Sequence, residues 1–223
     1  MNIITEKSVH FWVKNYDINR AGPTLLKHLS NIDLTQIEDK QERNIQYGNL
    51  LRDQSNLKVV PSVLRAFISR LAYESGAVAY TPDSVITKNN IMEHPLVKRS
   101  VYSFKVEWSA THLVVSKDKK SYIALLANGD VLIKGQASKD ISPKLVEHIF
   151  RLFELKLSSF KSSFLRLPTS VFAVNNIVIV GDESYKVNDF ETFDLEVNHE
   201  YYWRKCLQFI YPIEMYKNNI NMI

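Results

Sequence analysis

Hydrophobic residues recur at helical spacing in the first third of the chain. Along the predicted helix at residues 61–75, six of them form one apolar stripe, which predicts an amphipathic helix: Val60, Val63, Leu64, Phe67, Ile68 and Leu71. Pro61 is typical of a first helical turn, and Gly76 is typical of the left-handed position that follows a helix. The pattern therefore predicts both the buried face of this helix and its two ends.

Two more helices are predicted before this one. The first runs from Pro23 to Ser30, where leucines recur at helical spacing. The second covers residues 36–53 and is mostly polar, with Asp33 or Thr35 as its expected N-cap. Its narrow apolar stripe indicates a helix that is partly exposed or that packs against a partner.

Alternation of polar and apolar positions begins after residue 100. Residues 102–108 alternate strictly, and residues 113–116, 122–126 and 131–134 follow as further strand candidates. The pair Asn128-Gly129 is a strong hairpin signal between the last two of these. Residues 101–135 are therefore predicted to form an antiparallel meander.

The last third mixes helical and strand patterns. Ser142 and Pro143 open a predicted helix whose apolar face continues to Phe164. Residues 171–180 are typical of a second hairpin, and residues 185–187 of one more strand. The predicted fold is α+β, with a helical N-terminal third (residues 1–95) followed by an antiparallel meander and hairpin sheet packed by one long helix (residues 96–223).

Composition places the 223-residue chain among ordinary globular proteins, with 45% hydrophobic and 23% charged residues. The net charge is +4, and lysine outnumbers arginine about two to one, which suits general phosphate attraction better than base-specific readout. The single cysteine, Cys206, indicates a reducing compartment, so we expect a cytoplasmic protein (host cytoplasm if viral). No apolar run is long enough for a membrane helix, and no membrane partner is expected. The Asn- and Ile-rich bias is typical of AT-rich phages and mobile elements.

Motifs for common cofactors are missing from the sequence. The six glycines form no phosphate-binding loop, and no two of the six histidines stand at metal-ligand spacing. Cys206 follows Arg204 and Lys205, but a small core residue is the simpler interpretation. The adjacent pairs Glu147-His148 and His199-Glu200 are interpreted as surface positions. The sequence therefore predicts no cofactor, no metal site and no catalytic residue.

Two groups of acids and lysines are the candidates for a metal-dependent phosphodiester hydrolase. They are Asp130 with Lys134, and Asp182 and Glu183 with Lys186. Both groups fall on predicted hairpin turns, where acidic residues are expected for conformational reasons alone.

Two basic and aromatic segments are candidates for nucleic-acid binding. The residues with this expected role are Lys98, Arg99, Tyr102, Phe104, Lys105, Lys156, Lys161 and Arg166. In the first segment Tyr102 and Phe104 share one strand face, which either stacks bases or belongs to the core.

The aromatic tail is the candidate protein interface, through Tyr201, Tyr202, Trp203 and Tyr211, unless these rings close the core. The function expected first is a non-catalytic interaction or assembly protein that binds another protein or a second copy of itself. Nucleic-acid binding is the alternative, and phosphodiester hydrolysis is the second alternative.

Overall fold

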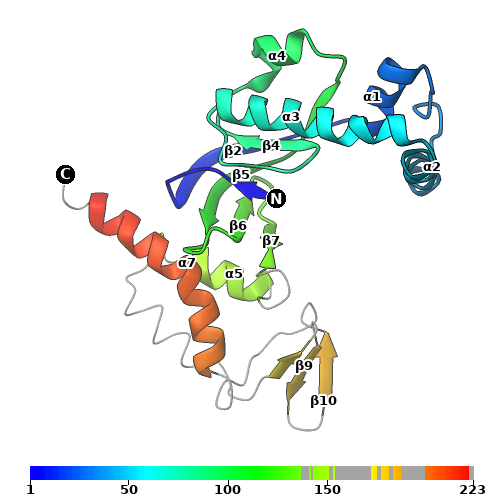
Figure 1. Ribbon diagram of the computed structural model, residues 1–223. Coiled ribbons are helices and arrows are strands. Elements are labelled where there is room, and N and C mark those ends of the chain that lie inside the picture. Colours follow the sequence, from blue (N-terminus) through cyan, green and yellow to red (C-terminus); the bar gives the residue numbers. More distant parts are fainter. Residues whose placement is uncertain are drawn as a thin grey trace. The chain divides into compact units, whose positions relative to one another are not determined.

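The computed structural model describes residues 1–136, 141, 143–150, 153, 172–174, 177–180, 183–186 and 199–220. The chain divides into two compact units. Unit 1 consists of Met1–Thr5 and Val13–Ser109, and unit 2 consists of Glu6–Trp12 and Ala110–Ile223. The fold is α+β, as the sequence predicts, with a seven-stranded antiparallel sheet in the order β1-β3-β4-β2-β5-β6-β7 (Figure 1).

The elements of the first half of the chain alternate between strands and helices. In chain order they are β1 (Asn2–Ile3), β2 (Val9–Ile18), α1 (Ala21–Ser30), α2 (Lys40–Asp53), η1 (Ser55–Lys58), α3 (Val59–Glu74), β3 (Ala79–Tyr80), β4 (Ser84–Thr87), η2 (Ile91–Glu93), α4 (Pro95–Lys98) and β5 (Phe104–Val115). Residues 77–96, expected to be mainly a connection, contain β3 and β4. The prediction missed them because both strands are short and Pro82 interrupts the apolar pattern between them.

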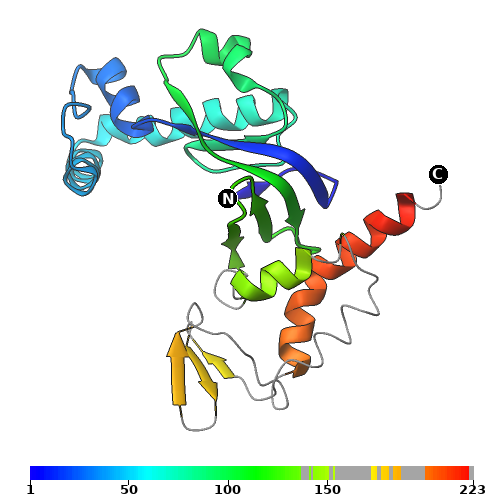
Figure 2. The same cartoon turned by 180° about the vertical axis from the view of Figure 1, so that it is seen from behind.

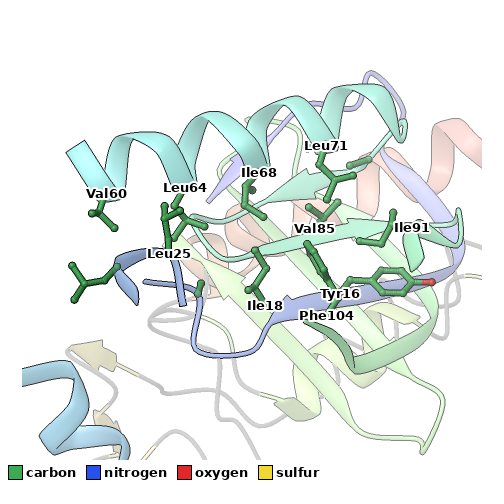
Figure 3. Packing of buried hydrophobic residues seen from close by; sticks show 14 of the residues in the cluster. Tyr16, Ile18, Leu25, Val60, Leu64, Ile68, Leu71, Val85, Ile91 and Phe104 are labelled. Carbon is green, nitrogen blue, oxygen red and sulfur yellow. The ribbon is translucent and has the colours of Figure 1, made fainter. Parts of the chain in front are cut away.

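The core of unit 1 lies between helix α3 and the strands β2 and β4. Ile68 and Leu71 of α3 point toward Val85 of β4 and Tyr16 of β2 (Figure 3), and all four belong to one buried cluster. The apolar stripe predicted for α3 is therefore confirmed at Leu64, Ile68 and Leu71, whereas Val63, which the prediction placed on the same stripe, is exposed. Gly76, at φ +62°, follows the helix in the left-handed conformation that the sequence predicts.

Helix α2 begins later than the sequence predicts. Asp39 is its N-cap, with a side-chain oxygen that accepts a hydrogen bond from the Glu42 N–H at 2.6 Å. Asp33, one of the expected caps, instead accepts from the N–H of Thr35 at 2.9 Å and closes a local turn. Both expected caps are thereby occupied in the turn that precedes the helix.

Strand β5 joins two segments that were predicted as separate strands. It continues through Ser109–Thr111 because the pairing with β6 shifts register between Ala110 and His112. Such a bulge interrupts the alternation of side chains without ending the strand, which explains why the sequence pattern breaks at this point.

Unit 2 continues the chain with a hairpin and two helices. Its elements are β6 (Ser121–Leu126), β7 (Val131–Gly135), α5 (Pro143–Phe150), β8 (Phe172–Val174), β9 (Ile177–Val180), β10 (Glu183–Lys186) and α7 (His199–Ile220). The predicted Asn128-Gly129 turn joins β6 to β7, with Gly129 at φ +91°. Strands β8 and β9 confirm the second predicted hairpin, and β10 extends it to a three-stranded sheet (Figure 2). Most of the predicted continuation of α5 to Phe164 lies outside the described residues.

Helix α7 contains a proline that the surrounding chain accommodates. Pro212 has no N–H, so the carbonyl of Gln208 lacks its normal helical partner. The backbone N–H of Lys117 donates to that carbonyl at 2.9 Å, and the Lys117 ammonium lies 4.6 Å from the centre of the Tyr211 ring. The turn after β5 is therefore bonded to the middle of α7. Across the described residues, every helix is too short or too polar to span a bilayer.

Candidate functional site

One face of the unit 1 sheet is polar where β2 lies beside β5, although Ile86 of β4, opposite Asn15, is a buried apolar residue of the same face. In β2, Tyr16 and Ile18 are core residues, so the alternation of a strand places Asn15 and Asp17 on the opposite face. Two contacts with β5 mark this face. The Asn15 Nδ2 donates to Glu107 Oε2 at 2.7 Å, and the Lys105 Nζ lies 3.9 Å from Asp17 Oδ2. We call Asn15, Asp17, Lys105 and Glu107 the polar face.

A second carboxylate, Asp83, lies at the same end of the neighbouring strand. Asp17 of β2 pairs with Ser84 of β4, and the N–H of Ile18 donates to the carbonyl of Asp83 at 2.8 Å. The Thr81 hydroxyl donates to the Asp83 carboxylate at 2.7 Å. The antiparallel register therefore places Asp83 opposite Ile18, one residue beyond Asp17, although the two acids are 66 positions apart in the sequence.

The electrostatics of Asp17 reflect this crowding. Burial raises the pKa of Asp17 most strongly, and the negative charges of Asp83 and Glu107 raise it further. Lys105 and Lys40 act in the opposite direction and lower it. A half-buried carboxylate that is surrounded by others is stabilised in its ionised form by any additional cation.

A cationic depression of about 360 Å³ begins beside the polar face. Asn19 and Ser103, which help to line it, stand two residues from Asp17 and Lys105 along their chains. The other lining residues are Arg20, Thr24, Lys27, Thr35 and Val101. The first turn of α1 also borders the depression, and the N–H groups of a helix start favour anions.

The outer wall of the depression is held by Asp33. Its carboxylate lies 2.6 Å from the Lys27 Nζ and accepts from the Thr35 N–H, while the Arg20 guanidinium donates to the Thr35 carbonyl. The hydrogen bonds from Lys27 and Thr35 hold the pKa of Asp33 far below its usual range. Lys27 and Arg20 therefore have fixed positions at the mouth of the depression.

The ligand types suit a hard cation that keeps part of its water shell. Within the described part of the chain, no group of three or more His, Cys, Asp and Glu side chains has the arrangement of a metal site. Mg²⁺ sites in phosphate-processing proteins, however, commonly use one or two carboxylates, with water and substrate phosphates completing the coordination. Asp17 and Asp83 are two carboxylates that influence one another electrostatically in this region.

The structure places the predicted nucleic-acid residues of the first segment in different environments. Phe104 is buried, and Tyr102 is half-buried with its ring 4.8 Å from that of Phe67. Burial, with Tyr47 nearby, raises the pKa of Tyr102 to about 12. Both rings therefore belong to the core.

The basic residues of this segment lie at the surface. Lys98 pairs with Glu93, and Arg99 is exposed beyond the end of α4. Only Lys105 belongs to the polar face. Lys156, Lys161 and Arg166 lie outside the described residues.

The other predicted candidates lie in unit 2. Tyr211 is exposed on α7, whereas the side chains of Tyr201, Tyr202 and Trp203 lie outside the described part of that helix. Asp130 is exposed and accepts a hydrogen bond from Asn128 within its turn. Asp182 and the side chain of Glu183 lie outside the described residues. Cys206 is fully buried, and burial raises the pKa of its thiol, so it is not poised as a nucleophile.

Asp17 and Asp83 were missed by the sequence reasoning. The available signals were an acid at the end of an alternating apolar run and an acid beside Pro82. Neither is distinctive alone, because their significance comes from the pairing of β2 with β4.

The sequence matches no known protein family and no curated protein. The chain has a distant structural similarity to part of the family B DNA polymerase from the hyperthermophilic archaeon Pyrobaculum calidifontis, with a TM-score of 0.46 and 13% sequence identity. The similar region covers 72% of this chain and 32% of the polymerase chain. A similarity of this kind defines no function for the chain.

Proposed function

We propose that unit 1 carries out phosphoryl transfer on a nucleic-acid strand with the help of a divalent cation. The observation that carries the proposal is the electrostatic coupling of Asp17 on β2 to Asp83, which immediately precedes the neighbouring strand β4, close to a depression lined by Arg20 and Lys27. The acids attract a divalent cation, and the depression attracts an anion. A phosphate group is the substrate that satisfies both at once.

Each part of the site has a defined role in this proposal. Asp17 and Asp83 bind the cation, which polarises a phosphoryl oxygen. Arg20 and Lys27 of the depression balance the negative charge that collects on the other phosphoryl oxygens. Lys105, which is exposed and lies beside Asp17, attracts the strand to the polar face.

A polyanionic substrate is consistent with the charges around the site. The chain has a net charge of +4, and the side chains of Lys27 and Lys105 are more than half exposed. Exposed lysines beside a charged groove increase the local concentration of a nucleic acid and make its binding dependent on salt.

The test uses the full chain and end-labelled DNA oligonucleotides, single- and double-stranded, with Mg²⁺ or Mn²⁺ and the four nucleoside triphosphates. We expect a metal-dependent change in product length on a denaturing gel. Shorter products identify water as the nucleophile, which attacks a phosphodiester and displaces a strand hydroxyl. Longer products identify a strand-end hydroxyl as the nucleophile, which attacks the α-phosphorus of a nucleoside triphosphate and displaces pyrophosphate. DNA that keeps its length in every reaction, with both metals, contradicts the proposal.

A protein interface on α7 is a second candidate function, because one side of that helix exposes apolar residues. Leu207, Tyr211 and Met215 follow at intervals of four, and each is between 36% and 45% exposed. Cys206, Phe209 and Ile213, by contrast, are buried. Such a stripe of apolar and aromatic side chains is typical of an interface.

A second copy of the chain is the partner that we propose for this stripe. We expect the chain to form a concentration-dependent dimer in light scattering, and the substitution Tyr211→Ser to weaken it at least fivefold because a central aromatic contact is lost. The matched control is Tyr73→Ser, at an exposed tyrosine of α3 in unit 1. A chain that stays monomeric at high concentration, or equal effects of the two substitutions, contradicts self-association through α7.

A further inference from the structure

We propose that Asn15 is a positioning residue for the divalent cation, acting through Glu107 and through its own amide oxygen. This inference rests on the proposed function of unit 1 and assigns a role to a residue that no motif identifies. It begins from the position of Asn15 on β2, on the same strand face as Asp17 and two residues before it.

The Asn15 amide has a hydrogen-bond partner for its nitrogen but none for its oxygen among the described residues. Its Nδ2 donates to Glu107 Oε2 at 2.7 Å, which fixes the orientation of that carboxylate. Its Oδ1 is buried and has no hydrogen-bond partner among the described residues. Asn15 as a whole is only 5% exposed. Buried amide oxygens are nearly always paired, so an unpaired one on a residue that contacts Glu107 and stands two residues from Asp17 points to an additional hydrogen-bond donor.

A hydrated cation at Asp17 and Asp83 supplies what this oxygen lacks. Its coordinated waters carry polarised O–H groups that donate to neutral amide oxygens as well as to carboxylates. Glu107, held by the Asn15 Nδ2, presents its other oxygen to the same ion or its water. Asn15 thus orders one carboxylate and receives one hydrogen bond, as outer ligands of metal sites commonly do.

A substitution of Asn15 that preserves or increases stability but weakens Mn²⁺ binding separates this role from a purely structural one. Asn15→Leu removes the unpaired oxygen, so the chain should unfold at an equal or higher denaturant concentration. The same change should weaken Mn²⁺ binding to the full chain by about 10- to 100-fold, as measured by electron paramagnetic resonance of free Mn²⁺. Asn15→Asp keeps the size but removes the Nδ2 donor that orients Glu107, so it should also weaken Mn²⁺ binding.

The matched control is Gln208→Met on α7. Gln208 also has a buried side-chain oxygen without a partner among the described residues, but it lies in unit 2. We expect this control to leave Mn²⁺ affinity within twofold of the original chain. Equal affinity losses in Asn15→Leu and Gln208→Met overturn the inference.

Asp17→Asn distinguishes the two possible failures. If Asp17→Asn weakens Mn²⁺ binding and Asn15→Leu does not, Asn15 has no positioning role and the proposed function stands. If Asp17→Asn leaves Mn²⁺ binding unchanged, both the proposed function and this inference are wrong. If Asn15→Leu does not fold, Asn15→Asp decides, and an unchanged Mn²⁺ affinity in that variant overturns the inference.

Discussion

Asp17→Asn and Asp83→Asn are each expected to reduce the metal-dependent processing of DNA by at least about 100-fold, because each removes a charge that holds the cation. The measurement is the initial rate of change in product length at saturating Mg²⁺. The matched control is Asp130→Asn, which removes an exposed acid from the β6–β7 turn. If Asp130→Asn abolishes the reaction while Asp17→Asn does not, the site lies elsewhere in the chain.

Asp17→Asn has a second expected effect, on stability. Because burial and the neighbouring carboxylates raise the pKa of Asp17 in the folded chain, its ionised form destabilises the fold at neutral pH. The substitution should therefore increase the free energy of unfolding by on the order of 1 kcal/mol. The gain should disappear as the pH falls through the raised pKa, because protonation then neutralises Asp17 in the original chain. Loss of activity together with increased stability is typical of a functional residue and excludes simple misfolding.

The parts of the fold that the sequence predicts are those that depend on residues close together in the chain. The stripe of α3, the Gly76 cap and the Asn128-Gly129 turn depend on residues within a few positions of each other. The cap and the turn are confirmed, and the stripe is confirmed except at Val63, which is exposed. Strands β3 and β4 have only two and four residues, so each carries little periodicity of its own. They are stabilised by pairing with β1 and β2, which is a property of the tertiary structure.

The candidate site was less predictable than the fold, since it depends on contacts across three strands. Asp17, Asp83 and Glu107 come from β2, the start of β4, and β5, and no short motif contains any two of them. The sequence instead predicted nucleic-acid binding by aromatic residues flanked by lysines. Phe104, one of these, is a core residue because it faces α3. Alternation along β5 placed Phe104 on the buried face correctly, but Val106, two residues later on the same predicted face, is exposed.

The stability of the site depends on the core behind it, and Ile68 is the residue through which this is best tested. Ile68 is fully buried in the middle of α3, between Leu64 and Leu71, and faces β2 and β4 (Figure 3). Asp17 lies on β2, and Asp83 immediately precedes β4. Ile68→Ala should reduce the free energy of unfolding by roughly 2 to 5 kcal/mol, through lost burial and the cavity that remains. Ile68→Val should cost about 0.5 to 1.5 kcal/mol.

Hydrogen exchange at individual amides is the measurement that locates this loss. Faster exchange is expected across α3, β2 and β4, because these elements share the cluster around Ile68, whereas the hairpin β6–β7 belongs to unit 2 and should keep its protection. Val63→Ala on the exposed side of α3 is the matched control and should change the free energy of unfolding by less than about 0.5 kcal/mol. Equal losses for Val63→Ala and Ile68→Ala would mean that α3 packs on the sheet through a different face. The pairing of β2 with β4, which places Asp17 opposite Ser84, would then not depend on the packing of Ile68.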